Sequence, residues 1–115
     1  MVRKPFYRTK ENLAGGKGVI EFYDVIHPEE MGKAGRLFTK IVVNPGCSLG
    51  YHQHVGETEP YFITAGKGLY TDSDGTQTVV SAGDVCMINF GESHGIENPF
   101  DEVLEIIAVI YNDIK

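Results

Sequence analysis

Short apolar segments separated by turn-forming residues constrain the fold of this chain more than any other feature. Combinations such as Asn44-Pro45-Gly46, Ser73-Asp74-Gly75 and Ala82-Gly83-Asp84 recur along the sequence, and they favour turns. The segments between such turns are rich in β-branched and aromatic residues, which are typical of strands. They cover residues 19–25, 36–44, 49–54, 59–64, 69–71, 76–80, 85–90, 94–97 and 102–111. Many short strands without a long helix indicate an all-β sandwich or barrel.

Two segments need a decision about their type. Residues 102–111 are long enough for a helix, but Val103, Ile106, Ile107 and Val109 are β-branched and favour a strand. Residues 28–31 begin with a proline and predict a single helical turn.

The length of 115 residues fits one domain. Residues 1–18 are polar, basic and rich in glycine. We interpret them as an N-terminal arm that lies over the barrel or on a partner subunit. Residues 19–115 then form a single barrel domain.

The charge of the chain is unevenly spread. Residues 1–40 hold eight Lys or Arg against five acids, and residues 41–115 hold two against eleven, which gives the net charge of −6. Nucleic-acid binding needs many contacts from Lys and Arg to phosphate, so the acidic part argues against a nucleic-acid partner. The basic start, with Arg3, Lys4, Arg8 and Lys10, is interpreted as a solvated arm.

Residues 1–20 lack the apolar run of a secretory signal. No stretch approaches the ~20 apolar residues of a membrane span. We therefore expect a cytoplasmic protein without a membrane partner. Cys47 and Cys86 are then interpreted as reduced, small hydrophobic residues rather than as a disulfide or as nucleophiles.

Four residues predict a site for one divalent metal ion: His52, His54, Glu59 and His94. Three imidazole nitrogens and one carboxylate oxygen suit manganese, iron, zinc or nickel. His52 and His54 share one face if they lie in a strand. A turn over residues 55–58, helped by Gly56, would bring Glu59 back beside them on an adjacent strand.

These residues also form two motifs. The first has the pattern G-x5-H-x-H-x4-E-x6-G from Gly46 to Gly66, and the second has G-x5-N-x-G-x2-H-x3-N from Gly83 to Asn98. Together they resemble the two motifs of the cupin superfamily. The one departure is Asn89, where the family usually has proline, and it affects a turn position rather than a ligand.

The resemblance implies a double-stranded β-helix, or jelly-roll barrel, with a metal held by the four residues. Similar small cupins include dioxygenases, decarboxylases, isomerases and lyases, so it implies a metal-dependent enzyme acting on a small organic molecule without choosing the reaction. Similar cupins also pair as homodimers, through their sheets or by exchanging N-terminal strands.

Two alternatives remain open. One is a non-catalytic protein that binds a sugar or a small carboxylate, and the other is a metal-free structural barrel. No arginine lies in either motif, so an arginine clamp for a carboxylate would need Arg36 or an arm from a neighbouring subunit. This disfavours oxalate-type chemistry.

Strand alternation predicts the walls of a ligand cavity. Tyr61 and Ile63 should face inward. In the last strand Glu105 should face water, which turns inward Leu104, Ile106, Ala108 and Ile110. For the strand at 36–44 the alternation allows two inward sets, which are Phe38 with Lys40, or Leu37 with Thr39 and Ile41.

Two polar residues outside the predicted set of metal ligands, Glu57 and His27, remain to be interpreted. Glu57 is expected to be a solvent-facing turn residue, with the alternative that it accepts a hydrogen bond from a metal ligand. His27 is expected to be an ordinary loop histidine.

Overall fold

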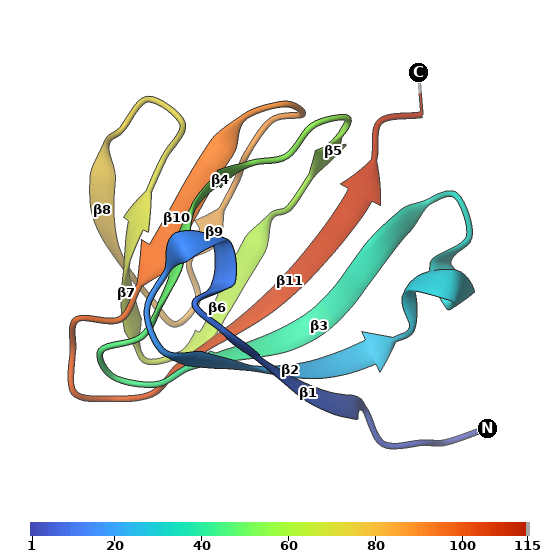
Figure 1. Cartoon of the computed structure of the whole chain (residues 1–115), viewed down its shortest axis with the longest axis horizontal. Coiled ribbons are helices and arrows are strands. Elements are labelled where there is room, and N and C mark those ends of the chain that lie inside the picture. The colour runs from blue at the N-terminus through green and yellow to red at the C-terminus, as the bar shows by residue number, and fades with distance from the viewer. Residues whose placement is uncertain (115) are drawn as a thin grey trace.

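The computed structural model describes residues 1–114 and shows two antiparallel β-sheets that enclose a common interior (Figure 1). The larger sheet has the strand order β1 (Phe6–Glu11), β2 (Val19–Ile26), β3 (Gly35–Val43), β11 (Leu104–Asn112), β6 (Tyr61–Ala65), β9 (Val85–Cys86), and β5 (Glu57–Thr58) also pairs with β11. The smaller sheet has the order β4 (Ser48–Gln53), β10 (Ser93–Glu97), β7 (Lys67–Thr71), β8 (Gln77–Ser81). The predicted all-β barrel is confirmed.

Helical structure within residues 1–114 is limited to two short 3₁₀ turns, η1 (Leu13–Gly15) and η2 (Pro28–Met31). The helical turn expected at 28–31 is therefore confirmed, and so is the strand expected at 102–111. In the described part of the chain, no helix has the length and apolar character that a membrane crossing requires.

Three segments differ from the predicted strands. Residues 6–11 form β1, which pairs with β2 of the same chain, although the polar sequence gave no apolar alternation there. The strand expected at 85–90 ends at Cys86, because Asn89 and Glu92 hydrogen-bond to each other across a turn. The strand expected at 59–64 begins only at Tyr61 as β6, because Glu59 lies in the short connection between β5 and β6.

The core lies between the inward faces of the two sheets. Tyr61 and Ile63 are buried as predicted, and so are the four predicted residues of β11, with Glu105 partly exposed beside them. In β3 the inward set is Leu37, Thr39 and Ile41, because Thr39 and Ile41 are completely buried. This settles the choice that alternation alone left open.

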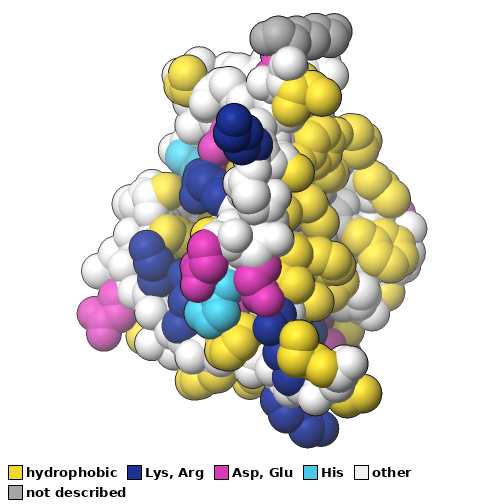
Figure 2. Space-filling model, turned by 90° about the vertical axis from the view of Figure 1, so that its right-hand side faces the viewer, with side chains coloured by type: hydrophobic (Ala, Val, Ile, Leu, Met, Phe, Trp, Pro, Cys, Tyr) yellow, Lys and Arg dark blue, Asp and Glu magenta, His cyan; other side chains and the backbone are white. Residues whose placement is uncertain are grey.

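The outer face of the larger sheet carries an apolar patch beside the Lys40–Glu105 salt bridge. Across β6, β9 and β11, Phe62 lies opposite both Val85 and Ile107 in the strand register. Phe62 and Val85 are 46% and 60% exposed, and Val109 extends the set along β11. In the side view of Figure 2, hydrophobic side chains form a continuous band down one side of the molecule. We call Phe62, Val85, Ile107 and Val109 the outer apolar face.

Candidate metal centre and its cavity

The fold brings together the four residues that the sequence selected. His52 lies on β4, His54 directly follows that strand, Glu59 lies between β5 and β6, and His94 lies on β10. One possible ligand atom from each residue falls within 4.8 Å of all the others. His94 is directly opposite His52 in the pairing of β10 with β4. Register and a short loop thus assemble a group that could hold a metal ion.

Glu59 reaches the histidines by a different route from the one expected. It was predicted on a strand adjacent to the histidine strand, but β4 and β6 belong to opposite sheets. The turn at Gly56, where φ is +72°, carries the chain across the barrel from one sheet to the other. Glu59 therefore faces the histidines across the interior.

Each histidine has its Nδ1 atom occupied by a partner. His52 Nδ1 donates to the carbonyl oxygen of Gly50 at 2.6 Å, and His54 Nδ1 lies 2.7 Å from Oε2 of Glu57. His94 Nδ1 is 3.0 Å from the hydroxyl of Tyr70. These partners fix the ring orientations and turn all three Nε2 atoms towards one point.

The Nε2 atoms and the Glu59 carboxylate are closely packed. Nε2 of His54 lies 3.0 Å from Nε2 of His52 and 3.1 Å from Nε2 of His94. Oε1 of Glu59 is 3.1 Å from His54 Nε2 and 3.2 Å from His94 Nε2. Rings that carry their proton on Nδ1 direct Nε2 lone pairs at one another, which is unfavourable unless a cation lies between them.

The electrostatics of the cluster favour an ionised carboxylate. Burial alone would raise the pKa of Glu59, but the three histidine rings packed against its carboxylate hold it well below its usual value. Burial lowers the pKa of His54, and its hydrogen bonds to Glu59 and Glu57 outweigh this and raise it. Burial lowers the pKa of His94, which is completely buried, more than Glu59 raises it.

The donor set fits a borderline divalent metal. Three imidazole nitrogens and one carboxylate oxygen are the ligands that such ions take, and metal-bound histidines normally have Nδ1 held by another group. This set could be predicted because the residue types, and the spacing within each of the two motifs, are local features of the sequence.

Glu57 does not face solvent as expected. Its side chain is only 13% exposed, and it accepts from His54 while pairing through both oxygens with Arg36 at 2.8 and 2.7 Å. The Arg36 guanidinium is the main cause of the lowered pKa of Glu57. The alternative interpretation, a hydrogen-bond acceptor for a metal ligand, describes its position.

A cavity of about 190 Å³ opens beside the cluster. It is lined by His52, His54 and Glu59 but not by His94, so it reaches the cluster from one side. The apolar wall comes from both sheets and from η1, and consists of Leu13, Ala14, Phe22, Leu37, Ile41, Leu49 and Ile110. This volume is below the ~300–1,000 Å³ of pockets for drug-sized ligands and suits a small molecule.

Three cations complete the lining: Arg8, Lys10 and Arg36. From the sequence, Arg36 was the one candidate of this chain for a carboxylate clamp, whereas Arg8 and Lys10 were interpreted as part of a solvated arm. For Arg8 this was wrong, because it is half-buried beside the cavity; Lys10 is exposed, as expected, and also lines the cavity. The sequence pattern that places Arg8 and Lys10 on one side of the chain is the two-residue spacing of Phe6, Arg8 and Lys10. This spacing becomes informative only once β1 is known to be a strand.

The remaining candidates stay outside the cluster. His27 caps η2 and packs against Phe6 with ring centroids 3.8 Å apart, as expected of a loop histidine. Cys47 and Cys86 are both free thiols, and burial raises the pKa of Cys86 to about 12. Neither cysteine lines the cavity.

The chain is similar to known proteins in both sequence and fold. An "Oxalate-binding protein" of Thermotoga maritima is 43% identical over 99 residues, which span 86% of this chain and 81% of that protein. A crystal structure of a predicted oxalate decarboxylase from Thermotoga maritima has a TM-score of 0.89 at 39% identity, covering 95% of this chain and 94% of the other.

A second solved structure extends the likeness beyond this pair. A Cupin 2 conserved barrel domain protein from Salinispora arenicola has a TM-score of 0.73 at 26% identity, covering 99% of this chain and 90% of the other. The double-stranded β-helix that the motifs implied is therefore confirmed. The family model of the Cupin domain matches residues 39–110, which include all four residues of the cluster. The chain belongs to the cupin family.

Proposed function

We propose that this protein binds a small carboxylate anion at a divalent metal ion held by His52, His54, Glu59 and His94. The observation that carries the proposal is the cavity itself. Apart from the cluster, its polar lining groups among the described residues are three cations and no acid. Arg8 and Arg36 are paired with Asp24 and Glu57 behind the lining, whereas Lys10 forms no salt bridge within residues 1–114. In a chain with a net charge of −6, such a lining favours an anionic ligand.

Oxalate is the first ligand to test. The name of the Thermotoga maritima relative and the description of the Thermotoga maritima structure both mention oxalate, and the small cavity suits an ion of this size. The sequence argument against oxalate-type chemistry depended on a lack of arginine near the motifs. Arg36 and Arg8 line the cavity, so that argument loses its basis. A bound metal would supply a Lewis acid for a carboxylate oxygen.

Binding without turnover is better supported than catalysis. General acid–base catalysis needs a titratable group within reach of the ligand. Beyond the cluster, the cavity lining among the described residues offers only Lys10 for such a role, since guanidinium groups do not exchange protons in catalysis of this kind. Its other residues are apolar. The non-catalytic alternative therefore becomes the proposal, and the metal-dependent enzyme becomes the competing hypothesis.

The first test is elemental analysis of protein purified without chelator, on the wild type and on the double variant His52→Ala/His54→Ala. We expect near one equivalent of manganese, iron, zinc or nickel per wild-type chain and a loss of that metal in the variant. A wild-type protein that takes up none of these metals, even after reconstitution, would contradict the metal site.

The second test is calorimetric titration of oxalate into the metal-loaded and the chelator-treated protein. We expect binding only to the metal-loaded form. The same samples, incubated with oxalate in air, are then assayed for formate, carbon dioxide and hydrogen peroxide. Formation of these products at a rate above that of the double variant would favour the enzyme and overturn the binding-only proposal.

A further inference from the structure

We propose that Lys10 selects ligands with a second negative charge, by pairing with the anionic group that points away from the metal. The inference deepens the proposed function and depends on it. It assigns a role to β1, a strand that lies outside the matched family region of residues 39–110.

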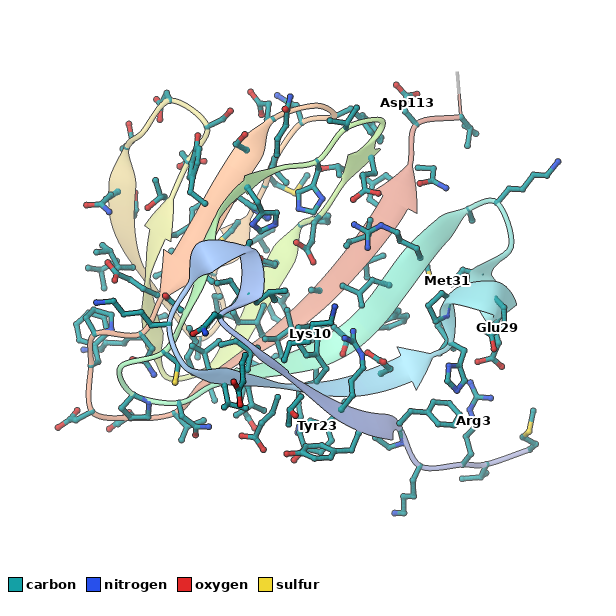
Figure 3. The ribbon with its side chains drawn as sticks, viewed as in Figure 1. Arg3, Lys10, Tyr23, Glu29, Met31 and Asp113 are labelled. Atoms are coloured by element: carbon teal, nitrogen blue, oxygen red, sulfur yellow. The ribbon has the colours of Figure 1, made fainter. Side chains whose placement is uncertain are left out.

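The register of β1 places Lys10 on the inner side of the sheet. Lys10 is directly opposite Ile20, and Arg8 is opposite Phe22. Residues that face each other across paired strands share one side of the sheet. Ile20 and Phe22 are core residues, so Arg8 and Lys10 point towards the cavity that they line. Figure 3 shows Lys10 near the centre of the view, whereas Arg3 lies near its edge.

The two arginines of the cavity already have strong partners. Arg8 binds the buried carboxylate of Asp24 at 2.7 and 3.3 Å and lies 4.1 Å above the ring of Phe22. Arg36 forms a two-bond pair with Glu57. Pulling either guanidinium away would leave a largely buried carboxylate without its cation, which is costly. Each pair therefore contributes little net charge to the cavity.

Lys10 is different, because no acidic partner is recorded for it among residues 1–114. Its ammonium group has three donors and a flexible stem, and it remains available for a ligand. With a divalent ion in the cluster, the Glu59 carboxylate leaves one positive charge there, and Lys10 adds a second. The loaded cavity thus matches the charge of a dicarboxylate dianion.

The segment that carries Lys10 is fixed to the metal-binding strand. The turn after β1 packs against β4, where Gly50 lies so close to Ala14 and Gly16 that an added Cβ would overlap the Ala14 carbonyl oxygen. The carbonyl of Gly50 itself accepts the hydrogen bond from His52. This contact sets the position of Lys10 relative to the cluster, as recognition of both ends of a ligand requires.

The test compares diacids with their monoamides, which have nearly the same shape but one charge fewer. Oxalate, malonate and succinate, with oxamate, malonamate and succinamate, are titrated into metal-loaded wild type and into the Lys10→Met variant. For the diacid that binds best, we expect Lys10→Met to weaken binding roughly tenfold or more, as for hydrogen bonds to charged groups. Binding of the matching monoamide should change by less than about twofold.

Lys4→Met is the matched control, because Lys4 is exposed, precedes β1 and does not line the cavity. It should leave all six affinities unchanged. Metal content and melting temperature are measured for each variant, and both should equal those of the wild type. A change in either for Lys10→Met would assign Lys10 a structural role and overturn the inference.

The outcomes separate this inference from the proposed function. A wild type that binds metal but none of the six ligands contradicts the proposed function, and the inference with it. A wild type that binds diacids and monoamides equally well, or a Lys10→Met variant that loses both to the same degree, overturns only the role of Lys10.

Discussion

Among single residues, Glu57 has the most consequential contacts outside the four candidate ligands. Glu57 accepts a hydrogen bond from Nδ1 of His54 and forms a salt bridge with Arg36. Glu57→Ala should therefore release the His54 ring and weaken metal binding by ~10–100-fold, which is typical when the group that orients a metal ligand is lost. Calorimetric titration of the chelator-treated protein with zinc measures this.

The control for Glu57→Ala is Glu29→Ala. Glu29 is exposed on η2 and is labelled at the right-hand side of Figure 3. The Glu29→Ala substitution removes the same charge as Glu57→Ala without changing a residue of the metal cluster or its partners. Equal zinc affinities for the two variants would show that Glu57 does not position His54.

The two cysteines should differ in reactivity. Cys86 is 4% exposed and its pKa is raised to about 12 by burial, so at pH 8 it remains a protonated, covered thiol. Cys47 is half-buried. Ellman's reagent should therefore modify one thiol in the native protein at pH 8 and two after denaturation. In Cys47→Ser the native reaction should disappear, and a persistent native signal would contradict the assignment.

At the level of elements, the contact between η1 and β4 connects the start of the chain with the metal-binding strand. Gly50→Ala would force a Cβ onto the Ala14 carbonyl oxygen and push the two elements apart. We expect a loss of ~1–3 kcal/mol in the free energy of unfolding, as for other overpacked sites, measured by urea denaturation.

Gly95→Ala is a milder comparison within the same sheet. Its added Cβ would lie 3.1 Å from backbone atoms of Tyr51, which a small shift can relieve. The Gly50→Ala variant should therefore be clearly the less stable of the two. A neutral Gly50→Ala would indicate that η1 moves aside easily.

The strands that the sequence could predict are those with apolar alternation and strong turn residues. The hairpin at Ser73-Asp74-Gly75, with φ of +86° at Gly75, and the long strand β11 are examples. β1 could not be predicted, because its inward residues Arg8 and Lys10 are charged and its outward side is exposed. Their place in a strand depends on pairing with β2, which is a tertiary property.

For the whole molecule, we propose that a second copy of the chain covers the outer apolar face. The face lies in a chain with a net charge of −6, yet Phe62, Val85 and Ile107 are neighbours without a charge between them. A surface of this kind can meet its own copy without like-charge repulsion. We therefore propose that the expected homodimer forms through the outer apolar face.

Matched substitutions test the dimer. Val85 on the outer apolar face is 60% exposed and Val79 on β8 of the smaller sheet is 55% exposed. Sedimentation velocity should show a dimer for the wild type and for Val79→Asp, and a monomer for Val85→Asp. A monomeric wild type, or dissociation caused by Val79→Asp instead, would contradict the proposed surface.

The residues of the site, like the strands, fall into those that could be predicted from the sequence and those that could not. His52, His54, Glu59 and His94 could be predicted, because their chemistry and spacing are visible in the sequence. Glu57 and Arg36 could be named only as alternatives, and Arg8 and Lys10 could not be predicted, because the roles of all four come from partners distant in sequence. Arg36 meets Glu57 across 21 residues, and Lys10 meets the cavity only through β1.

The position of β11 has a consequence for synthesis on the ribosome. This strand lies between β3 and β6 in the larger sheet, so a nascent chain that ends before residue 104 leaves those two strands without their shared neighbour. Their edges and apolar faces must then remain apart or be protected until β11 emerges. The barrel and the entire metal cluster can therefore mature only after translation has passed residue 112.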